Sequence, residues 1–337
     1  MKASEIVSIL DIDPLKKYGA KIMFTNGYLC LDSPICQATF GCEEIIPEAV
    51  VLFSQVKTAF KHLATGKVTV MDNKFIVRDS SFRLTVPILP DDEFAFAEEL
   101  DVPEGVAVIT KEMADHIEKC LPYTSEDISQ PNLCAVHIKD GWMESTNRAS
   151  FLRVKTNIKN NVSIYNSVIA PLLLALSKIG EVAIWQDDSV HMVGKGFFCK
   201  APIMAEIKGA PDINQILTEK EHFEVDVPIK EVFSEAKKIV DIAEELGNDK
   251  SYGIQVKAGA GKIIISCANQ SSEMRRVIAC PVKQEITFSI NKDTVKTLPQ
   301  FLPDKMKTIF FKLDAEYIIM KVYNDSMEFY TTAMMVA

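Results

Sequence analysis

Lysines recur along the helices that the sequence predicts, and they are the residues whose type and spacing most clearly suggest a chemistry. They are Lys57, Lys61, Lys111, Lys119, Lys178, Lys237, Lys238, Lys292 and Lys296. A lysine ammonium is a point charge on a flexible stem, so it can hold a phosphate without a fixed docking geometry. Equivalent helices that each carry lysines could therefore offer a positive lane to a polyanion. The alternative is that these are ordinary solvated helix faces, where lysine is common.

The sequence contains no pattern that predicts an active site. The motifs G-x-x-x-x-G-K-[ST], H-E-x-x-H and G-x-S-x-G do not occur. Cys134 and His137 resemble half of a zinc site, but no second half with ligand spacing is visible. The eight cysteines are scattered, mostly in apolar runs, as expected of reduced thiols in a cytosolic protein. We therefore expect no catalytic residue, no cofactor and no metal, although Cys36 and Cys42 leave a thiol enzyme as a distant alternative.

Composition and charge indicate a globular protein. Hydrophobic residues make up 47% of the 337 residues and charged residues 25%, with a net charge of −9. The acidic balance argues against a generally basic nucleic-acid binder, but it does not exclude a basic surface on one face. No apolar run reaches the roughly 18 residues of a membrane span, and no apolar signal segment follows Met1. We expect a soluble protein of the bacterial cytoplasm, or of a host cytoplasm if the chain is viral, with no membrane partner.

The elements that must position the lysines are predicted to repeat. The C-terminal stretch 288–337 reads as a strand end, a helix that Asn291 can cap, and three alternating apolar strands. The same β-α-β-β-β unit is predicted at 50–89 and at 162–205. The period of about 110 to 125 residues indicates repeated domains, because solenoid repeats have periods of roughly 20 to 50 residues.

A half-domain of similar plan is predicted before each of these copies. Helices that begin near Thr110 and Pro228 each lead into three strands, whereas Pro14 cuts short the helix expected around Ile6. Each third of the chain should then be an α+β domain with two helices packed on two antiparallel sheets. The expected domains are 1–104, 105–219 and 220–337.

Three stretches resemble segments of a known family. Residues 209–217, GAPDINQIL, are similar to a G-x-F-P-D-Y-x-x-V-L segment. Phe288–Ile290, followed by a helix with Leu298, resembles an F-N-V-x-Y-L segment, and the helix at Pro171 matches in kind. In this order and spacing they resemble the β-type sliding clamps, the DNA polymerase III beta subunit-like processivity factors of bacterial-type replicative polymerases. The resemblance spans nearly the whole chain.

Two segments depart from the family pattern. The family loop T-D-G-H-R-L stands here as TNRASF at 146–151, and the family C-terminus M-P-M-R-L is replaced by AMMVA at 333–337. The chain is also somewhat short for the family. We interpret it as a divergent member, with a bacteriophage as one source that would fit.

The resemblance implies a fold and a set of partners. Three tandem clamp domains per chain should assemble head to tail with a second copy into a closed ring, since a heterologous contact whose rotation closes gives a ring. Such a ring encircles duplex DNA without reading its sequence and tethers a DNA polymerase for processive synthesis. The implied partners are double-stranded DNA, a DNA polymerase, a clamp loader and a second copy of the chain. The lysines would face the duplex and contact its phosphates.

The resemblance also implies a pocket for partner peptides between the second and third domains. By position it maps to Phe151, Pro211, Ile216, Thr331, Ala333, Met334 and Met335. Flexible methionines suit a groove that takes several partners. Phe151 and Ile216 are equally good as core residues, so the mapping stays open. The alternative function is a clamp-fold interaction scaffold that does not encircle DNA.

Overall fold

The computed structural model describes residues 1–335 in part. The residues that it does not describe are 63–66, 91–93, 96–100, 204–211, 219, 226, 246–252, 269–272, 283–284, 299–301, 315 and 336–337. Of the predicted pocket residues, Pro211 and the side chain of Met335 lie outside the described part. The side chain of Lys61, one of the predicted DNA-binding lysines, lies outside it as well.

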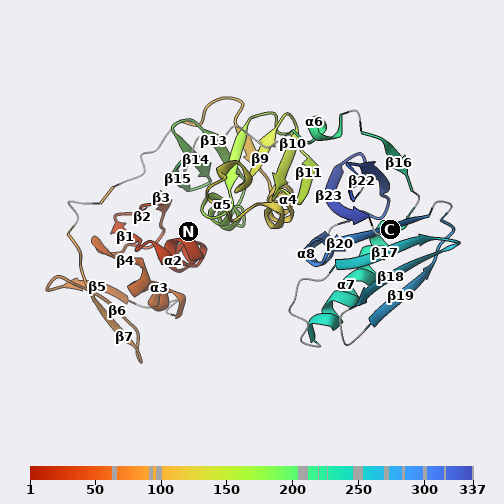
Figure 1. The fold of residues 1–337 in the computed structure, drawn as a ribbon. Coiled ribbons are helices and arrows are strands. Elements are labelled where there is room, and N and C mark those ends of the chain that lie inside the picture. The colour runs from red at the N-terminus through yellow and green to blue at the C-terminus, as the bar shows by residue number, and fades with distance from the viewer. Residues whose placement is uncertain are drawn as a thin grey trace. The chain divides into compact units, whose positions relative to one another are not determined.

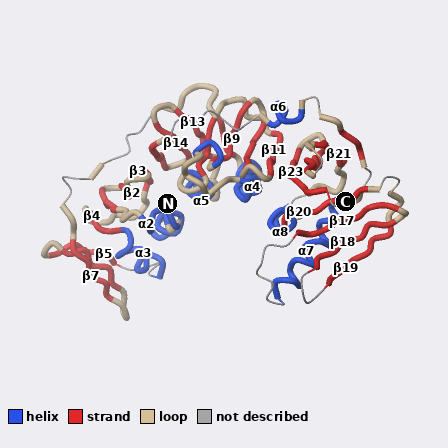
Figure 2. The backbone as a smooth tube through the Cα atoms, viewed as in Figure 1, coloured by secondary structure: helices blue, strands red, loops and turns tan. Residues whose placement is uncertain are grey.

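The chain divides into two compact units, each built from discontinuous segments. Unit 1 contains Met1–Glu118, Cys134–Gly141 and Thr156–Lys208, and unit 2 contains Lys119–Leu133, Trp142–Lys155 and Gly209–Ala337. Strands dominate both units (Figure 2). These two units do not test the predicted domain boundaries near residues 104 and 219, which stay a prediction.

Unit 1 opens with two short helices and then alternates hairpin strands with helices (Figure 1). Its helices are α1 (Ala3–Leu10), α2 (Asp13–Lys17), α3 (Phe53–His62), α5 (Ile169–Leu176) and α4 (Lys111–Cys120), whose last two residues belong to unit 2. Its strands are β1 (Lys21–Thr25), β2 (Tyr28–Ser33), β3 (Cys36–Gly41), β4 (Ala49–Leu52), β5 (Lys67–Met71), β6 (Lys74–Arg78), β7 (Arg83–Pro87), β8 (Ala107–Ile109), β9 (Ala135–Lys139), β12 (Val162–Tyr165), β13 (Val182–Gln186), β14 (Ser189–Gly194) and β15 (Phe197–Pro202).

An eight-stranded sheet forms the larger part of unit 1. Its order is β4-β1-β2-β3-β15-β14-β13-β8, and all neighbouring strands in it are antiparallel. A separate sheet holds β5, β6 and β7, and β12 pairs with β9. Helix α1 packs against α3 and α5 through its buried residues Ile6, Val7 and Leu10. Pro14 stands in the first turn of α2, a position that suits its missing N–H, so the predicted break after α1 is real.

Unit 2 has the same kinds of element. Its helices are the 3₁₀ turns η1 (Leu121–Tyr123) and η2 (Pro131–Leu133), and the α-helices α6 (Ile213–Leu217), α7 (Ile229–Glu245) and α8 (Lys292–Thr297). Its strands are β10 (Trp142–Thr146), β11 (Ser150–Lys155), β16 (His222–Glu224), β17 (Gly253–Gly259), β18 (Lys262–Ala268), β19 (Glu273–Ala279), β20 (Ile286–Asn291), β21 (Lys307–Lys312), β22 (Tyr317–Tyr323) and β23 (Met327–Met335).

Strand β23 has three partner strands: β11 pairs with residues 327–331 of it, β20 with residues 334–335, and β22 with residues 328–334. From β20 the sheet continues through β17 and β18 to β19, and from β22 it continues through β21 to β16. Helix α7 packs on β18 and β19, α8 packs on β20, and the two helices contact each other (Figure 1). Their apolar residues, such as Val232, Ile239 and Val295, are buried against the sheet.

The predicted repeat of elements is confirmed. Five successive runs have a strand, a helix and three strands: β4 to β7, β8 to β11, β12 to β15, β16 to β19, and β20 to β23. The first run, α1 to β3, begins with its helices and has no opening strand among the described residues. The described elements therefore form six similar runs, which is the α+β plan expected from the hydrophobic periodicity.

A half-buried charge network crosses the β11–β23 pairing. Arg153 and Glu328 are directly opposite each other, and the Arg153 Nε donates a hydrogen bond to Glu328 Oε2 at 2.5 Å. The same carboxylate accepts from Lys321 Nζ at 3.0 Å and from the Tyr330 hydroxyl at 2.7 Å. The Arg153 guanidinium also lies 4.7 Å above the Trp142 ring. Burial raises the pKa of Glu328, but the hydrogen bonds from Arg153, Tyr330 and Lys321 outweigh it and hold that pKa below its ordinary value.

We predict that Glu328→Gln lowers the free energy of unfolding by about 2–4 kcal/mol, because it removes the anion that half-buried Lys321 contacts and, among the described carboxylates, leaves Arg153 with only that of Glu144, at 3.9 Å. Urea denaturation at pH 7 measures the change. The control is Glu316→Gln on the exposed end of the β21–β22 hairpin, which should change stability by less than about 0.5 kcal/mol.

The pH dependence gives a second check on the network. Because the folded-state pKa of Glu328 is lowered, its contribution is present above the ordinary carboxyl pKa and is lost as the pH falls through the folded value. The stability difference between the wild type and Glu328→Gln should therefore shrink below about pH 4. A difference that is unchanged at low pH would contradict the network's role.

Candidate functional site

Carboxylates contact most of the predicted lysines for which the structure describes a side chain. In unit 1, Lys57 on α3 donates to Asp11 Oδ1 at 3.2 Å. In unit 2, Lys237 on α7 bonds Asp241 Oδ2 one turn later at 2.8 Å, and Lys238 bonds Glu235 Oε1 at 2.5 Å. These lysines are charged and solvent-accessible, but each already has an anion in reach.

Glu244 serves two lysines at once. Its Oε1 lies 2.5 Å from Lys296 Nζ and 3.9 Å from Lys292 Nζ, both on α8, so the contact joins the end of α7 to α8. The remaining predicted lysines differ. Lys111 is exposed at the start of α4, Lys119 is half-buried near its end, and Lys178 is exposed.

One correction concerns Lys178, which the sequence places on a helix. Helix α5 ends at Leu176, and Lys178 lies in the turn that follows. Leu173 and Ala175 accept hydrogen bonds from the backbone N–H groups of Ser177 and Lys178, so this turn is a tightened continuation of the helix.

An apolar pocket of about 320 Å³ lies within unit 2, between α6 and the strands β11, β22 and β23. Four buried residues form its apolar base: Phe151, Ile213, Ile319 and Tyr330. The rings of Phe151 and Tyr330, which are paired across β11 and β23, meet edge to face with centroids 5.7 Å apart. The pocket is thus a preformed hydrophobic hollow with aromatic walls, the type of site that takes apolar side chains.

Three of the residues that the resemblance mapped to a peptide pocket line this hollow. Phe151 is buried in its wall, Ile216 stands at its edge with 48% of its surface exposed, and Thr331 is buried and accepts a hydrogen bond from Ser150. Ala333 and Met334 do not line it: Ala333 is buried elsewhere along β23, and Met334 is 50% exposed. Both residues lie farther along β23, which continues to Met335, beyond the part of the strand that lines the pocket.

Most of the residues that line the pocket were not predicted from the sequence. The additional residues are Leu133, Thr146, Arg148, Ala149, Ser150, Ile213, Leu313, Ile319, Tyr330 and Thr332. Four of them lie in the 146–151 loop, which was compared with a family segment, so that loop was the place in the sequence where they could have been found. The others could not be found from periodicity, because a buried strand residue reads the same whether it faces the core or a pocket.

The loop at the rim of the pocket holds one exposed cation. Arg148 has a left-handed backbone, with φ of 75°, which is uncommon for a residue other than glycine. Asn147 stabilises the turn, since its side-chain oxygen accepts hydrogen bonds from the N–H groups of Ala149 and Ser150. The turn places a positive charge beside an apolar hollow.

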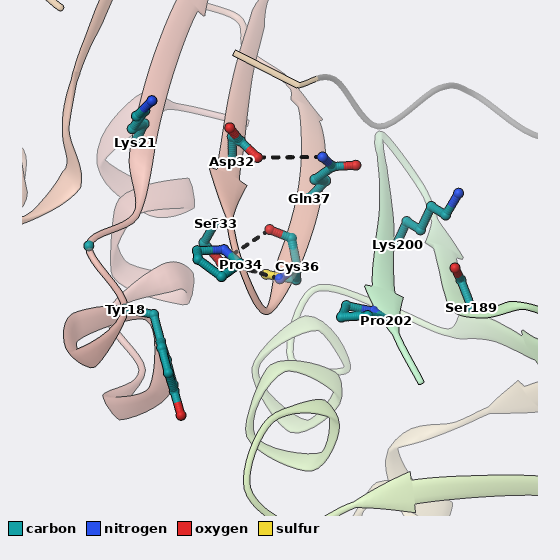
Figure 3. A pocket seen from close by; sticks show the side chains of 11 residues that line it. Tyr18, Lys21, Asp32, Ser33, Pro34, Cys36, Gln37, Ser189, Lys200 and Pro202 are labelled. Atoms are coloured by element: carbon teal, nitrogen blue, oxygen red, sulfur yellow. Dashed lines mark hydrogen bonds between the residues drawn. The ribbon is translucent and has the colours of Figure 1, made fainter. Parts of the chain in front are cut away.

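A second hollow, of about 570 Å³, lies in unit 1 beside β1, β2, β3 and β15 (Figure 3). Lys21, Asp32, Gln37 and Lys200 line it, and the Gln37 amide donates to Asp32 at 3.4 Å. Cys36 is at its wall but only 2% exposed. No group of His, Cys, Asp or Glu among the described residues has the arrangement of a metal site.

The thiol next to Cys36 is Cys199, from the paired strand β15, rather than the Cys42 suggested by sequence. A hydrogen bond from Cys199 lowers the pKa of Cys36, while that contact and burial raise the pKa of Cys199. Cys120 is fully buried, and burial raises its pKa to about 12. These thiols have the burial of core residues rather than the exposure of a nucleophile.

Comparisons with known proteins identify the fold. No protein-family model matches the sequence, and no curated protein matches it either. Solved structures match over nearly the full length. The DNA polymerase III beta subunit of Thermotoga maritima has a TM-score of 0.77 at 11% identity, covering 99% of this chain and 97% of that chain.

Two further matches agree. The DNA polymerase sliding clamp of Bacillus subtilis has a TM-score of 0.74 at 14% identity, covering 99% of this chain and 97% of that chain. The DNA polymerase III subunit beta of Pseudomonas aeruginosa has a TM-score of 0.73 at 14% identity, covering 98% of each chain. The chain therefore has the α+β fold of the beta sliding clamps along its whole length, and the resemblance seen in sequence is confirmed at the level of the fold. None of its described helices has the length and apolar character needed to cross a bilayer.

We predict that Cys120 in the folded protein resists alkylation by iodoacetamide at pH 8, because a thiol with a pKa of about 12 is almost entirely protonated there. Cys280, the half-buried thiol, should react first, and all eight thiols should react after denaturation. Peptide mass spectrometry reads the labelled positions. Rapid labelling of Cys36 in the folded protein at pH 6 would instead favour a thiol enzyme.

Proposed function

We propose that this protein is a DNA sliding clamp, which closes head to tail with a second copy into a ring around duplex DNA. The ring tethers a replicative DNA polymerase and is placed on DNA by a clamp loader. It performs no catalysis. The observation that carries the proposal is a regular pattern of pairing between the last strands of the runs, which among the described residues leaves two of those strands, β7 and β19, with a single neighbour.

The pattern joins runs that lie three places apart. The last strand of the first run, β3, pairs with the last strand of the fourth run, β15, in unit 1. The last strand of the third run, β11, pairs with the last strand of the sixth run, β23, in unit 2. Both pairings are antiparallel. If the count continues from the sixth run of one copy into the next copy, the run three places beyond the fifth is the second run of that next copy.

The last strands of the fifth and second runs, β19 and β7, are the two that this three-run spacing would pair between copies. Among the described residues, β19 of the fifth run pairs with β18 alone, and β7 of the second run pairs with β6 alone. Unpaired edges invite association with another chain. A contact between β19 of one copy and β7 of the next is heterologous, and two such contacts close a ring of two chains. Exposed apolar residues stand at both edges: Val277 in β19 and Phe82 before β7.

The lysine-bearing helices supply the DNA contact in this proposal. Phosphate contacts carry no sequence information, so they suit a protein that must move along any duplex. Enclosure rather than affinity then keeps the ring on DNA. The proposed contacts are made by Lys57, Lys61, Lys111, Lys119, Lys178, Lys237, Lys238, Lys292 and Lys296.

The apolar pocket of unit 2 supplies the polymerase contact. Its aromatic walls suit the apolar side chains of a short partner segment, and Arg148 at its rim suits an acidic residue or a terminal carboxylate in that segment. Phe151, Ile216 and Thr331 are the contacts that the sequence and the pocket share.

We predict that the ring stays on nicked circular DNA and leaves the same DNA after linearisation. Topological enclosure has no barrier at a free end, so gel filtration in about 0.15 M salt should separate the two substrates clearly. Loss from circles as fast as from linear DNA would favour the alternative, a clamp-fold scaffold that does not encircle DNA.

We predict that Val277→Asp weakens the dimer about tenfold or more, because it places a charge in the proposed β19–β7 contact. Sedimentation equilibrium measures the dissociation constant. The control is Ile128→Asp, since Ile128 is 84% exposed and far from either strand in sequence. Equal effects of the two variants would argue against this interface.

We predict that Ile216→Asp reduces the affinity for the C-terminal peptide of the cognate polymerase about tenfold, since it puts an unpaired charge at an apolar pocket. Met334→Asp is the matched control, because Met334 is equally exposed but does not line the pocket. Fluorescence anisotropy of the labelled peptide gives both affinities, and an unchanged affinity of the Ile216 variant would remove the pocket from the proposal.

A further inference from the structure

Glu244 occupies a position that is unfavourable for its own helix. It lies in the last turn of α7, which contains no basic residue, and the negative end of the helix dipole disfavours a carboxylate there. Lys292 is the first residue of α8, where the positive end of that dipole disfavours an ammonium. Each residue is thus mismatched with its own helix, and the contact across α7 and α8 offsets both mismatches.

The Glu244 carboxylate lies beside two lysines that, in the proposed function, contact DNA phosphates. Glu244 Oε1 is 2.5 Å from Lys296 Nζ and 3.9 Å from Lys292 Nζ, and these side chains are only half-buried. A carboxylate at hydrogen-bond distance from an ammonium makes the same kind of charge-assisted contact as a phosphate oxygen. A phosphate that approaches these two lysines therefore competes with Glu244 for their ammonium groups.

We propose that Glu244 is an internal competitor for DNA phosphates at Lys292 and Lys296, and that it weakens the grip of α8 on the duplex. This inference rests on the proposed clamp function. Because one anion replaces another, each lysine–phosphate contact gains little free energy and is easily broken. A surface of exchangeable contacts holds DNA loosely at every position, which is what movement along the duplex requires. The pairs of Lys57 with Asp11 and of Lys237 with Asp241 follow the same scheme.

The experiment compares two variants with the same change in net charge. Glu244→Gln removes the competing carboxylate, whereas Glu245→Gln removes its exposed neighbour, which forms no ion pair within the described part of the chain. Binding to a fluorescein-labelled linear duplex is followed by anisotropy across a series of salt concentrations. Glu244→Gln should bind about two- to fivefold more tightly, with a salt slope steeper by about one. Glu245→Gln should shift affinity by less than half as much.

Equal effects of the two variants would overturn the inference, because net charge alone would then explain them. Retention on nicked circles separates this failure from failure of the clamp function: a wild-type protein that leaves circles and linear DNA equally fast removes the function itself. If the wild-type protein is retained on circles but the two variants bind the linear duplex equally, only the proposed role of Glu244 is ruled out.

A second comparison keeps the inference testable if Glu244→Gln disturbs the α7–α8 contact. Lys296→Gln should weaken DNA binding by less than twofold, because a carboxylate already occupies that lysine. Lys178→Gln should weaken binding more, since Lys178 is exposed and forms no ion pair with the described residues. An effect of Lys296→Gln as large as that of Lys178→Gln would overturn the proposal.

Discussion

Backbone pairing between the last strands of distant runs is the constraint on which this structure depends. The last strand of each run has one edge that its own run leaves unpaired, and an open edge exposes unpaired N–H and C=O groups. The chain closes two of these edges internally, β3 on β15 and β11 on β23. The repeat therefore determines more than a succession of similar elements. Among the described residues, it pairs β3, β11, β15 and β23 within the chain and leaves β7 and β19 with one neighbour each.

The β11–β23 junction shows how side chains reinforce such a pairing. Arg153 and Glu328 face each other across it, and Lys321 and Tyr330 complete the contacts of the carboxylate. Tyr330 also forms part of the wall of the apolar pocket. The charge network and the wall of the pocket thus share one residue, so the pocket is held in shape by the same interactions that fix the strand register.

The charges on the helices follow a different logic. A net charge of −9 would repel DNA, and lysines on the helices offset this locally. Yet carboxylates such as Asp11, Asp241 and Glu244 stand directly on those lysines. Within each unit, carboxylates therefore already pair with lysines such as Lys57 and Lys296, whereas Lys111 and Lys178 are exposed.

The sequence by itself determined the elements and their repetition, because hydrophobic periodicity and turn residues act over a few neighbouring residues. It also indicated Phe151, Ile216 and Thr331 through the resemblance of short segments. Tertiary structure alone decided which carboxylate meets which lysine and which strands share an edge, as with Glu244 and Lys296, or Cys36 and Cys199. A period of two tells which face of a strand is buried, but not which distant strand lies beside it. Those partners depend on the packing of the whole chain.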